Sequence, residues 1–334
     1  MRLATYNAQW FDYLFDDHGR LLDDGGRSGR EGVTRARQTA ALGRVFQALD
    51  ADGVMIIEAP DARHGKRDGA RALETFARRF GLRAREALMG FPSGTQQEIA
   101  FLFDPDALHV RHDPQDGDPP RFDGGFRVDL DGDGRPEAVA WARPPLEIAA
   151  RTRAGNALRI IGVHAKSKAP HGARSEAQAT RIAIENRRKQ LAQCVWLRAR
   201  VERHLAAGDP LVVLGDFNDG PGLDEYERLF GRSGVEIVLG EGDGPRLFDP
   251  HARRAARRPT AAIPSTARFR LPPEMHWLSA LLDYVMVSPD LCARNPRWRI
   301  WHPFDDPGCY RDEDLREALL DASDHFPVTL DLDL

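Results

Sequence analysis

The chain has 334 residues, of which 42% are hydrophobic and 29% are charged, and its formal net charge is -4 at pH 7. This composition excludes a disordered chain and a globally basic nucleic-acid-binding protein, while local basic patches stay open. The uncharged apolar stretches are far shorter than the roughly 20 residues of a membrane-spanning helix, so we expect no stable membrane insertion.

The first half of the chain predicts a strand, a helix and a strand, followed by further strands. Residues 2–6 and 53–58 form strand-like apolar runs, and residues 35–49 carry apolar side chains at helical spacing. Residues 98–103 and 137–141 predict two more strands, each followed by a segment that contains proline.

The second half adds a buried strand at 158–164 and the longest helix at 175–205, a segment without proline or glycine. Short apolar runs at 211–214, 281–287 and 328–332 complete the predicted strands. Many strands that alternate with a few helices predict a layered α/β domain.

We expect a single domain over residues 1–334, because neither an internal repeat nor a clear linker divides the sequence. Two segments have the composition of loop insertions, near 104–135 and 240–273. The first is rich in proline and aspartate, and the second surrounds a basic stretch at 253–258.

The three cysteines, Cys194, Cys292 and Cys309, are odd in number and widely spaced, which matches neither a disulfide framework nor a CxxC metal site. We interpret them as core or incidental thiols. The first predicted strand begins too early to leave room for a signal peptide, so we expect a cytoplasmic protein, or a secreted one if a signal was removed. We also expect a monomer.

Acidic side chains gather in three strand-like runs. They lie in Gly215 to Asp219, in Leu282 to Val285 and in Ser323 to Val328, and the last run adds a histidine. Carboxylates at the ends of buried strands are a common way for a sheet to present ligands to a hard metal ion beside a proton-transfer pair. The sequence therefore predicts a metal-dependent hydrolase of phosphate esters.

Six short motifs along the chain resemble, in order, those of the endonuclease/exonuclease/phosphatase superfamily, the DNase I-like fold. They are Tyr6-Asn7, Glu58, Val163 to Ser167, Gly215 to Asn218, Leu282 to Tyr284 and Ser323 to Pro327. The resemblance spans nearly the whole chain. It implies a four-layer α/β sandwich in which two mixed β-sheets pack face to face between helices, with the active site at one edge.

The resemblance also implies a bound Mg²⁺ or Mn²⁺. Glu58 is the first expected ligand, and Asn7 and Asp324 are expected to hold the ion directly or through water. The plainer interpretations are a turn residue for Asn7 and a surface carboxylate for Glu58. Ile57 stands where relatives often have glutamine, which leaves the support of Glu58 open.

His325 and Asp283 are the expected imidazole–carboxylate pair, in which the carboxylate fixes the tautomer of the ring. His325 acts either as a general base or, when protonated, as a stabiliser of phosphoryl charge. Asp216 is the competing candidate for activating water, and we prefer it. Asn218 is expected to orient that water or to bind a phosphate oxygen, unless this motif is simply an Asx turn.

The resemblance places His164 against the scissile phosphate, with a buried core histidine as the alternative. Lys166 and Lys168 are expected to contact phosphate, because two of only four lysines fall in this short segment. Arg143 either reaches the phosphate or braces the acidic site, and the sequence does not distinguish these roles.

A separate acidic run, Asp129, Asp131 and Asp133 before Gly134, resembles the opening of a calcium-binding loop. It is not an EF-hand, because Ala140 stands where the twelfth loop position requires glutamate. The run binds a structural Ca²⁺ or is an acidic, solvated turn.

Nucleic acid is the preferred substrate, and the candidate contacts are basic: Lys166, Lys168, Arg174, Arg181 and the stretch 253–258. The alternatives are a phosphodiesterase or phosphatase for lipid headgroups or small phosphate esters. A lipid enzyme needs exposed aromatic tips, for which Trp298, Trp301 and Phe304 are candidates, although the alternating tryptophans favour a packed strand. A non-catalytic binding member of the superfamily is the least favoured interpretation.

Overall fold

Six strands form one mixed sheet of the computed structural model, which describes residues 1–62, 65–130, 132–221, 230–242, 244–257, 264–271 and 276–334. Their order across the sheet is β14 (Arg297–Ile300), β15 (Val328–Asp331), β1 (Arg2–Asn7), β2 (Gly53–Ala59), β4 (Glu98–Phe103) and β3 (Glu86–Met89). The central pair β1 and β2 is parallel, and the other pairs are antiparallel.

Five strands form the second mixed sheet. Their order is β13 (Asp283–Val287), β10 (Leu211–Asp216), β9 (Ala157–His164), β8 (Leu146–Thr152) and β5 (Leu108–His112), with β9 and β10 parallel. Two hairpins stand apart from the sheets: β6 (Phe126–Val128) with β7 (Glu137–Val139), and β11 (Ala267–Leu271) with β12 (His276–Ala280).

Alternating side chains of the central strands serve different cores, as the period of two in a strand requires. Met55 and Ile57 of β2 face the other sheet and pack with Val212 and Leu214 of β10. Val54 and Ile56 face the opposite way, toward the helices. Because the same alternation runs through both sheets, the two pack face to face over one apolar core.

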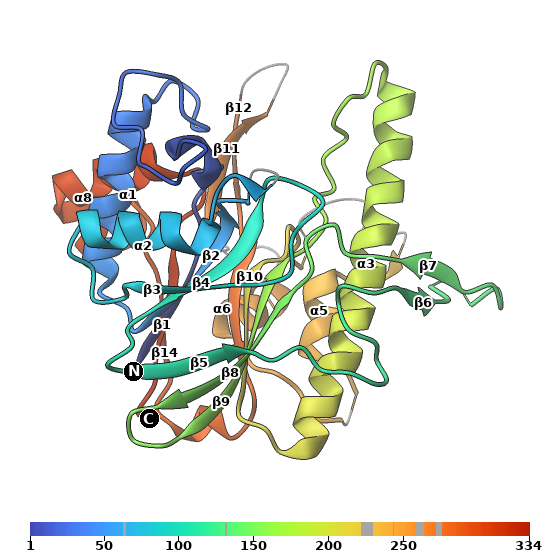
Figure 1. Ribbon diagram of the computed structural model, residues 1–334. Helices are drawn as coiled ribbons and strands as arrows, with labels where there is room; N and C mark the ends of the chain where they lie inside the picture. Colours follow the sequence, from blue (N-terminus) through green and yellow to red (C-terminus); the bar gives the residue numbers. More distant parts are fainter. Residues whose placement is uncertain (63–64, 131, 222–229, 243, 258–263, 272–275) are drawn as a thin grey trace.

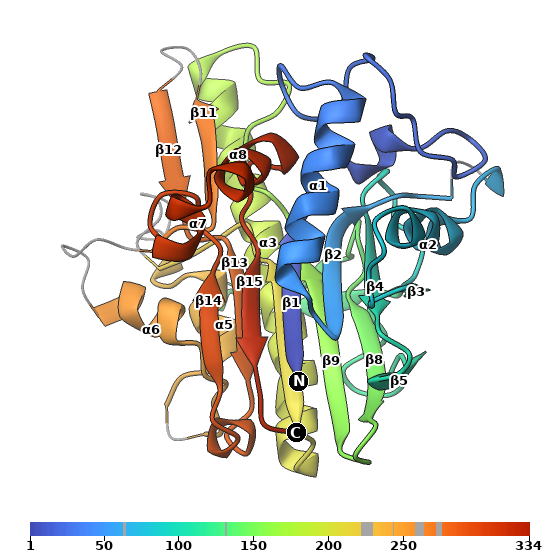
Figure 2. The same ribbon diagram turned by 90° about the vertical axis from the view of Figure 1, so that its left-hand side faces the viewer.

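Helices cover the outer face of each sheet and complete the four layers (Figure 2). The six-stranded sheet is covered by α1 (Arg35–Leu49), α2 (Gly69–Arg79) and α8 (Glu313–Ala322). The five-stranded sheet is covered by α3 (Glu176–Ala207), α5 (Gly234–Leu239) and α6 (Pro250–Arg257). The remaining short elements are η1 (Phe11–Leu14), η3 (Leu291–Ala293) and α7 (Pro307–Arg311).

The long helix α3 begins and ends as its sequence dictates. The Ser175 side chain accepts a hydrogen bond from the Gln178 backbone N–H at the first turn, and Gly208 ends the helix at φ 73°. The helix is therefore anchored at both ends, and its N-terminal end points to the same side of the molecule as the β11–β12 hairpin (Figure 1).

The helix predicted at 35–49 and the strand predicted at 98–103 have those bounds in the structure. The strand predicted at 137–141 is shorter, and the one predicted at 281–287 begins only at Asp283. The two predicted insertions contain regular elements, because 104–135 supplies β5 and β6 and 240–273 supplies α6 and β11. Within the described residues, no helix is long and apolar enough to cross a membrane.

Candidate active site

The expected site residues meet at one edge of the sandwich, where parallel strands end. Asn7 ends β1 and His164 ends β9, and Asp216 ends β10 between two neighbours. The register pairs Asp216 with His164 on one side and with Asp283 on the other. Sheet geometry alone therefore places two carboxylates and an imidazole side by side.

Gly215 lets β10 approach β9 closely at this point. Its φ is 144°, and a Cβ atom here would collide with the Val163 backbone. A residue with a side chain would push the strands apart, so the glycine before Asp216 fixes where that carboxylate lies.

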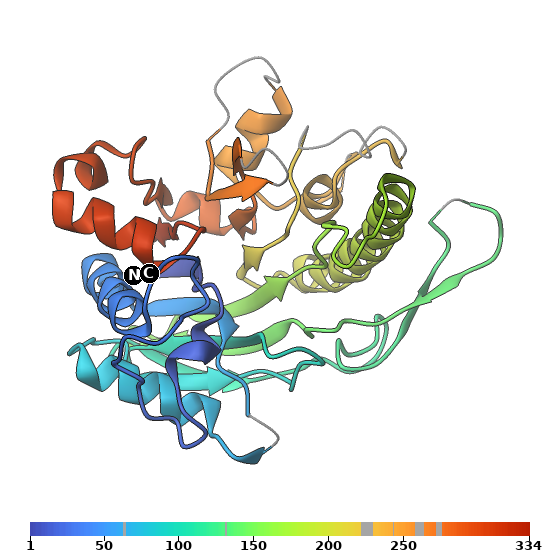
Figure 3. The same ribbon diagram turned by 90° about the horizontal axis from the view of Figure 1, so that it is seen from above.

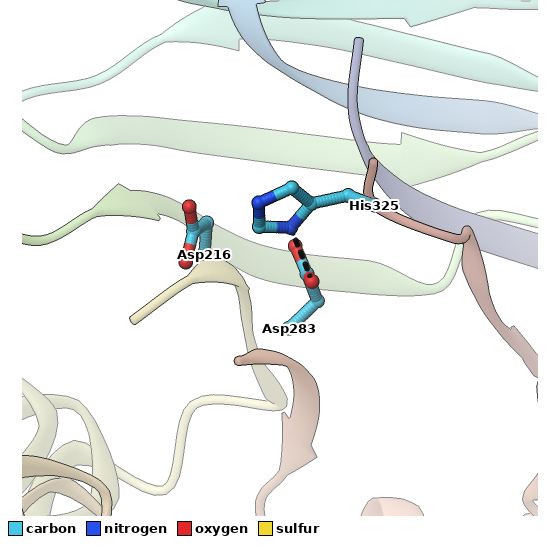
Figure 4. A group of neighbouring side chains, drawn as sticks. All are labelled: Asp216, Asp283 and His325. Carbon is cyan, nitrogen blue, oxygen red and sulfur yellow. Dashed lines mark hydrogen bonds and ion pairs between the residues drawn. The ribbon is translucent and has the colours of Figure 1, made fainter. Parts of the chain in front are cut away.

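His325 lies between Asp216 and Asp283, as Figure 4 shows. Its Nδ1 is 2.8 Å from Asp283 Oδ2, and the other ring nitrogen is on the Asp216 side. Burial alone would lower the pKa of His325, but the Asp283 and Asp216 carboxylates outweigh burial and raise it well above its usual value. The imidazole is therefore held as a cation at neutral pH.

Asp216 is buried, and within the described residues its hydrogen bonds come from neutral groups. Its Oδ1 accepts from the Asn218 backbone at 2.7 Å, and its Oδ2 accepts from the side chains of Asn7 and Asn218, each at 3.1 Å. Burial raises the pKa of Asp216 to about 7, against the opposing effect of His325. This carboxyl is therefore poised near neutrality, where a general base is most effective.

Glu58 projects from a β-bulge near the end of β2. Its φ is 62°, and the register with β4 shifts between Ile57 and Ala59. The Trp10 backbone N–H donates to Glu58 Oε2 at 2.7 Å, so the loop after β1 supplies the support that the sequence left open. A bulge turns a side chain out of the ladder, here toward the site.

The donor set around Glu58 fits a hard divalent cation. Burial raises the pKa of Glu58, and the negative charge of Asp324 adds to this effect although the Trp10 bond opposes it. Within the described part of the chain, no hydrogen bond reaches the Asp324 carboxylate. Two neighbouring carboxylates with free oxygen lone pairs are suitable ligands for Mg²⁺ or Mn²⁺.

Asn7 reaches this pair through its amide nitrogen. Nδ2 lies 3.4 Å from Glu58 Oε1 and 3.1 Å from Asp216 Oδ2, while Oδ1 accepts from the Gln9 backbone. In this orientation Asn7 bridges the two carboxylates, which suits support of a metal ligand better than direct ligation.

A second group, Asp216, Asp283 and His325, has ligand atoms within 4.8 Å of one another and could also hold an ion. A protonated imidazole has no lone pair to offer, however, and Asp283 already holds the ring by a hydrogen bond. The electrostatics therefore favour the position at Glu58 and Asp324 for a metal.

Arg143 braces His164. Its Nη1 is 2.9 Å from His164 Nε2 and 2.7 Å from Gln97 Oε1, and Nη2 donates to the Ala165 carbonyl at 3.2 Å. Arginine can only donate, so His164 Nε2 accepts and Nδ1 carries the proton. Burial, followed by the charge of Arg143, lowers the pKa of His164 well below its usual value, which keeps the ring neutral.

The two lysines of the 166–168 segment differ. Lys168 Nζ lies 2.7 Å from Asp219 Oδ1 in a nearly buried ion pair, so this contact gives it a structural role in place of the expected phosphate contact. Lys166 is partly exposed, and burial together with the charge of Arg143 lowers the pKa of its amine. Lys166 thus remains suited to a phosphate.

Two positioning residues escaped the sequence analysis. Thr266 Oγ1 accepts hydrogen bonds from the backbones of Leu282 and Asp283 at 3.0 and 2.9 Å, and it therefore sets the position of Asp283. Gln97 orients Arg143. Neither residue stands in a motif, and a lone threonine or glutamine gives no signal until the fold is known.

The acidic loop between β6 and β7 is closed by its own backbone. Asp129 accepts hydrogen bonds from the backbones of Gly132, Asp133 and Gly134, and Asp133 accepts from that of Arg135. Asp131 lies outside the described residues. The described carboxylates accept backbone N–H groups as in an Asx turn, and the binding of a structural Ca²⁺ stays a prediction.

The expected aromatic tips of a lipid enzyme are mostly buried. Trp301 is 5% exposed, and the Trp298 indole N–H donates to the Val285 carbonyl at 2.7 Å. Phe304 remains 42% exposed. Both tryptophans therefore pack against the protein in and around β14, as the packed-strand interpretation expects.

Comparison with known proteins places this geometry in context. A family model described as "Endonuclease/Exonuclease/phosphatase family" matches residues 4–325. No match was found among curated proteins.

Solved structures share the fold at low identity. A truncated TDP2 from Caenorhabditis elegans is 14% identical, with a TM-score of 0.53 over 98% of this chain and 96% of that one. The 3' phosphatase NExo from Neisseria, bound to a product DNA hairpin, is 18% identical, with a TM-score of 0.51 over 100% of both chains. An AP endonuclease from Archaeoglobus fulgidus is 13% identical, with a TM-score of 0.51 over 100% of both chains.

Proposed function

The chain belongs to the endonuclease/exonuclease/phosphatase family, whose members are phosphoric ester hydrolases, and on that basis we propose that it is a metal-dependent nuclease. The reaction is hydrolysis of a phosphodiester in nucleic acid by an activated water. One observation carries this proposal: the buried Asp216, whose pKa is raised to about 7, lies beside a cationic His325 where the strands end.

Asp216 is the base in this scheme. With a pKa of about 7 it is ionised in a large fraction of molecules at neutral pH and accepts the proton of the attacking water. The Asn218 backbone N–H holds Oδ1 at 2.7 Å, and the Asn7 and Asn218 side chains hold Oδ2, so the carboxylate is fixed in position for this role. His325 is already protonated and cannot serve as the base.

His325 instead stabilises negative charge. Its imidazolium, oriented by Asp283, donates from its second nitrogen to a phosphoryl oxygen as charge develops there. His164 adds a neutral ring held by Arg143, and Lys166 adds a positive charge at the rim. These groups bind the phosphate and hold it in line with the water on Asp216.

Glu58 and Asp324 would hold Mg²⁺ or Mn²⁺, with Asn7 supporting Glu58. Such an ion, when bound, polarises the phosphoryl oxygens and stabilises the leaving oxyanion. The two carboxylates repel each other without a cation, which is consistent with a site built for one.

Nucleic acid is favoured over lipid as the substrate for two reasons. Trp301 is buried and Trp298 is partly buried with its indole N–H bonded to a backbone carbonyl, so two of the three expected aromatic tips are not free to enter a membrane. Among the structures that share the fold, NExo is bound to a DNA hairpin. A phosphatase for small esters is the second candidate, because NExo is a 3' phosphatase.

Cleavage of supercoiled plasmid and of a chromogenic bis-aryl phosphodiester, each with Mg²⁺ or Mn²⁺, tests the proposal. We expect both substrates to be cleaved, and we expect EDTA and His325→Ala to abolish both activities. Cleavage of the small diester alone would contradict the nuclease assignment. Inactivity on both would contradict the diesterase chemistry and favour a monoesterase or a binding protein.

A further inference from the structure

The β11–β12 hairpin stands beside the active site and is joined to it by backbone contacts. Ala267 forms a β-bridge with His325, and the Arg268 backbone N–H donates to the Asp324 carbonyl at 2.7 Å. The hairpin rises at the edge where β10 ends (Figures 1 and 3). Whatever binds the hairpin therefore also lies next to the proposed metal and phosphate positions.

One face of the hairpin carries alternating aromatic and guanidinium groups. Arg270 pairs with Trp277 across the strands, and Arg268, two residues away, shares that face. The Arg268 Cζ atom lies 4.3 Å from the Trp277 ring centroid and 5.0 Å from that of Phe304, and Arg270 lies 4.9 Å from Trp277. We call these four residues the platform.

The platform is exposed and its charges are uncompensated. Trp277 is 47% exposed and Phe304 is 42% exposed, so two of the four most exposed large apolar side chains of the described residues stand here. Neither Arg268 nor Arg270 forms an ion pair within the described ranges, whereas nearby Arg299 is paired with Asp306 at 2.8 Å. Exposed aromatic area combined with unpaired guanidinium groups is typical of a binding surface.

We propose that the platform binds an unpaired nucleotide that flanks the scissile phosphate, with its base stacked on the aromatic and guanidinium planes and its phosphate bound by Arg268 or Arg270. This inference rests on the proposed function and adds that single-stranded or locally unpaired nucleic acid is the preferred substrate. Flat aromatic and guanidinium faces stack on bases that have left the duplex, because paired bases are already stacked on one another.

The composition of the platform argues against the other occupants. A membrane surface selects aromatic and aliphatic tips, but here two guanidinium groups lie over the rings. A small phosphate ester bound at Asp216 would not extend to Arg270, which is two residues farther along the strand from the Arg268 contact to Asp324. A strand of nucleic acid offers phosphates to the two arginines and bases to the two aromatic rings.

The test measures binding in EDTA, where turnover does not interfere. A labelled oligothymidylate and a blunt duplex of the same length are titrated into the whole chain and followed by fluorescence anisotropy. We expect Trp277→Ala to weaken oligothymidylate binding by about tenfold or more, since base stacking on aromatic residues has effects of this order. We expect Trp277→Phe to retain most of the affinity of the wild type. We expect Arg270→Gln to reduce the slope of the logarithm of the binding constant against the logarithm of the salt concentration by about 1, the loss of one phosphate contact.

Tyr310→Ala is the matched control, because Tyr310 is 55% exposed and has the Arg316 guanidinium over its ring, outside the hairpin. We expect it to leave oligothymidylate affinity within about twofold, as for a surface substitution. An equal loss in the Tyr310→Ala and Trp277→Ala variants would overturn the inference. So would an equal loss of duplex and single-strand affinity in Trp277→Ala.

Two further outcomes separate the inference from the proposed reaction. Binding to phosphatidylcholine vesicles that exceeds binding to oligothymidylate, and that Trp277→Ala removes, would overturn the platform as a nucleotide site. Loss of oligothymidylate binding in Trp277→Ala, in a protein that cleaves no diester, would support the platform and contradict the nuclease reaction alone.

Discussion

Asp216 and Asp219 lie three residues apart on the same segment, and both are almost completely buried, yet their surroundings differ. Asp219 Oδ1 is bonded by Lys168 at 2.7 Å and by Arg187 at 2.6 Å, and Oδ2 accepts from the Gly234 backbone at 2.5 Å. The described hydrogen-bond partners of Asp216 are all amides, and burial raises its pKa to about 7. Burial is common to both, so the number of positively charged hydrogen-bond partners separates a carboxylate held in an ion-pair cluster from one whose pKa is raised toward neutrality.

Among the variants that test this comparison, we expect Asp216→Asn to have the largest effect, which is a loss of turnover. The amide keeps the shape and most hydrogen bonds of the side chain but cannot accept the proton of water, so we expect kcat to fall by about a thousandfold. Stability should change by no more than about 1 kcal/mol, because the substitution removes a charge that lacks a cation bonded to it. Turnover of the bis-aryl diester and urea unfolding measure the two effects, and a loss below tenfold would exclude Asp216 as the base.

Asp219→Asn should have the opposite profile. It removes the carboxylate that pairs with the fully buried Arg187 and with Lys168, and we expect the free energy of unfolding to fall by roughly 3–5 kcal/mol. The control is Asp321→Asn, which removes the exposed pair with Arg37 and should cost less than about 1 kcal/mol. Both variants are measured by urea unfolding. Equal losses of unfolding free energy would contradict a structural role for the Asp219 ion pairs.

Glu98 tests the effect of burial on a carboxyl pKa at a position outside the candidate active site. It is buried, its carboxylate accepts from the Ser93 backbone, and burial raises its pKa to about 7. Since the folded pKa lies above the unfolded one, this group favours the folded state at low pH, and that contribution is lost as pH rises from about 4.5 to 7.

Glu98→Gln removes this dependence. The unfolding free energy of the wild type relative to Glu98→Gln should therefore decrease by about 2 kcal/mol between pH 5 and pH 8. Glu86→Gln, at an exposed strand position, serves as the control and should show no such trend. A parallel pH dependence for wild type and Glu98→Gln would show that burial without a cation is insufficient to move a carboxyl pKa in this protein.

The central strands and the long helices could be predicted because their sequences carry their own periodicity. The helix at 35–49 and the strand at 98–103 are examples. Strand β5 and the β11–β12 hairpin could not, since β5 holds only two apolar residues, Leu108 and Val110, and the hairpin interrupts its apolar residues with exposed polar ones. Such strands exist because of pairing partners far along the chain, which local sequence does not reveal.

The same division holds for the site. The motifs pointed to Asn7, Glu58, Asp216 and His325, and the structure brings their side chains to one edge of the sheets. The sequence could not tell that Lys168 faces Asp219, because the identity of a lysine says nothing about the carboxylate that packing brings to it. The role of Thr266 could not be predicted for the same reason, because its hydroxyl positions Asp283 by accepting hydrogen bonds from two backbone N–H groups.

The junction between the first and last strands has a consequence for biosynthesis. The Ser323 hydroxyl donates to the Asn7 carbonyl at 2.7 Å across 316 positions of sequence, and β15 pairs with β1. A ribosome delivers Asn7 and Glu58 long before Asp324 and His325, so the site cannot assemble while most of the chain is still being translated. The candidate site is therefore completed only when synthesis of the chain is nearly finished.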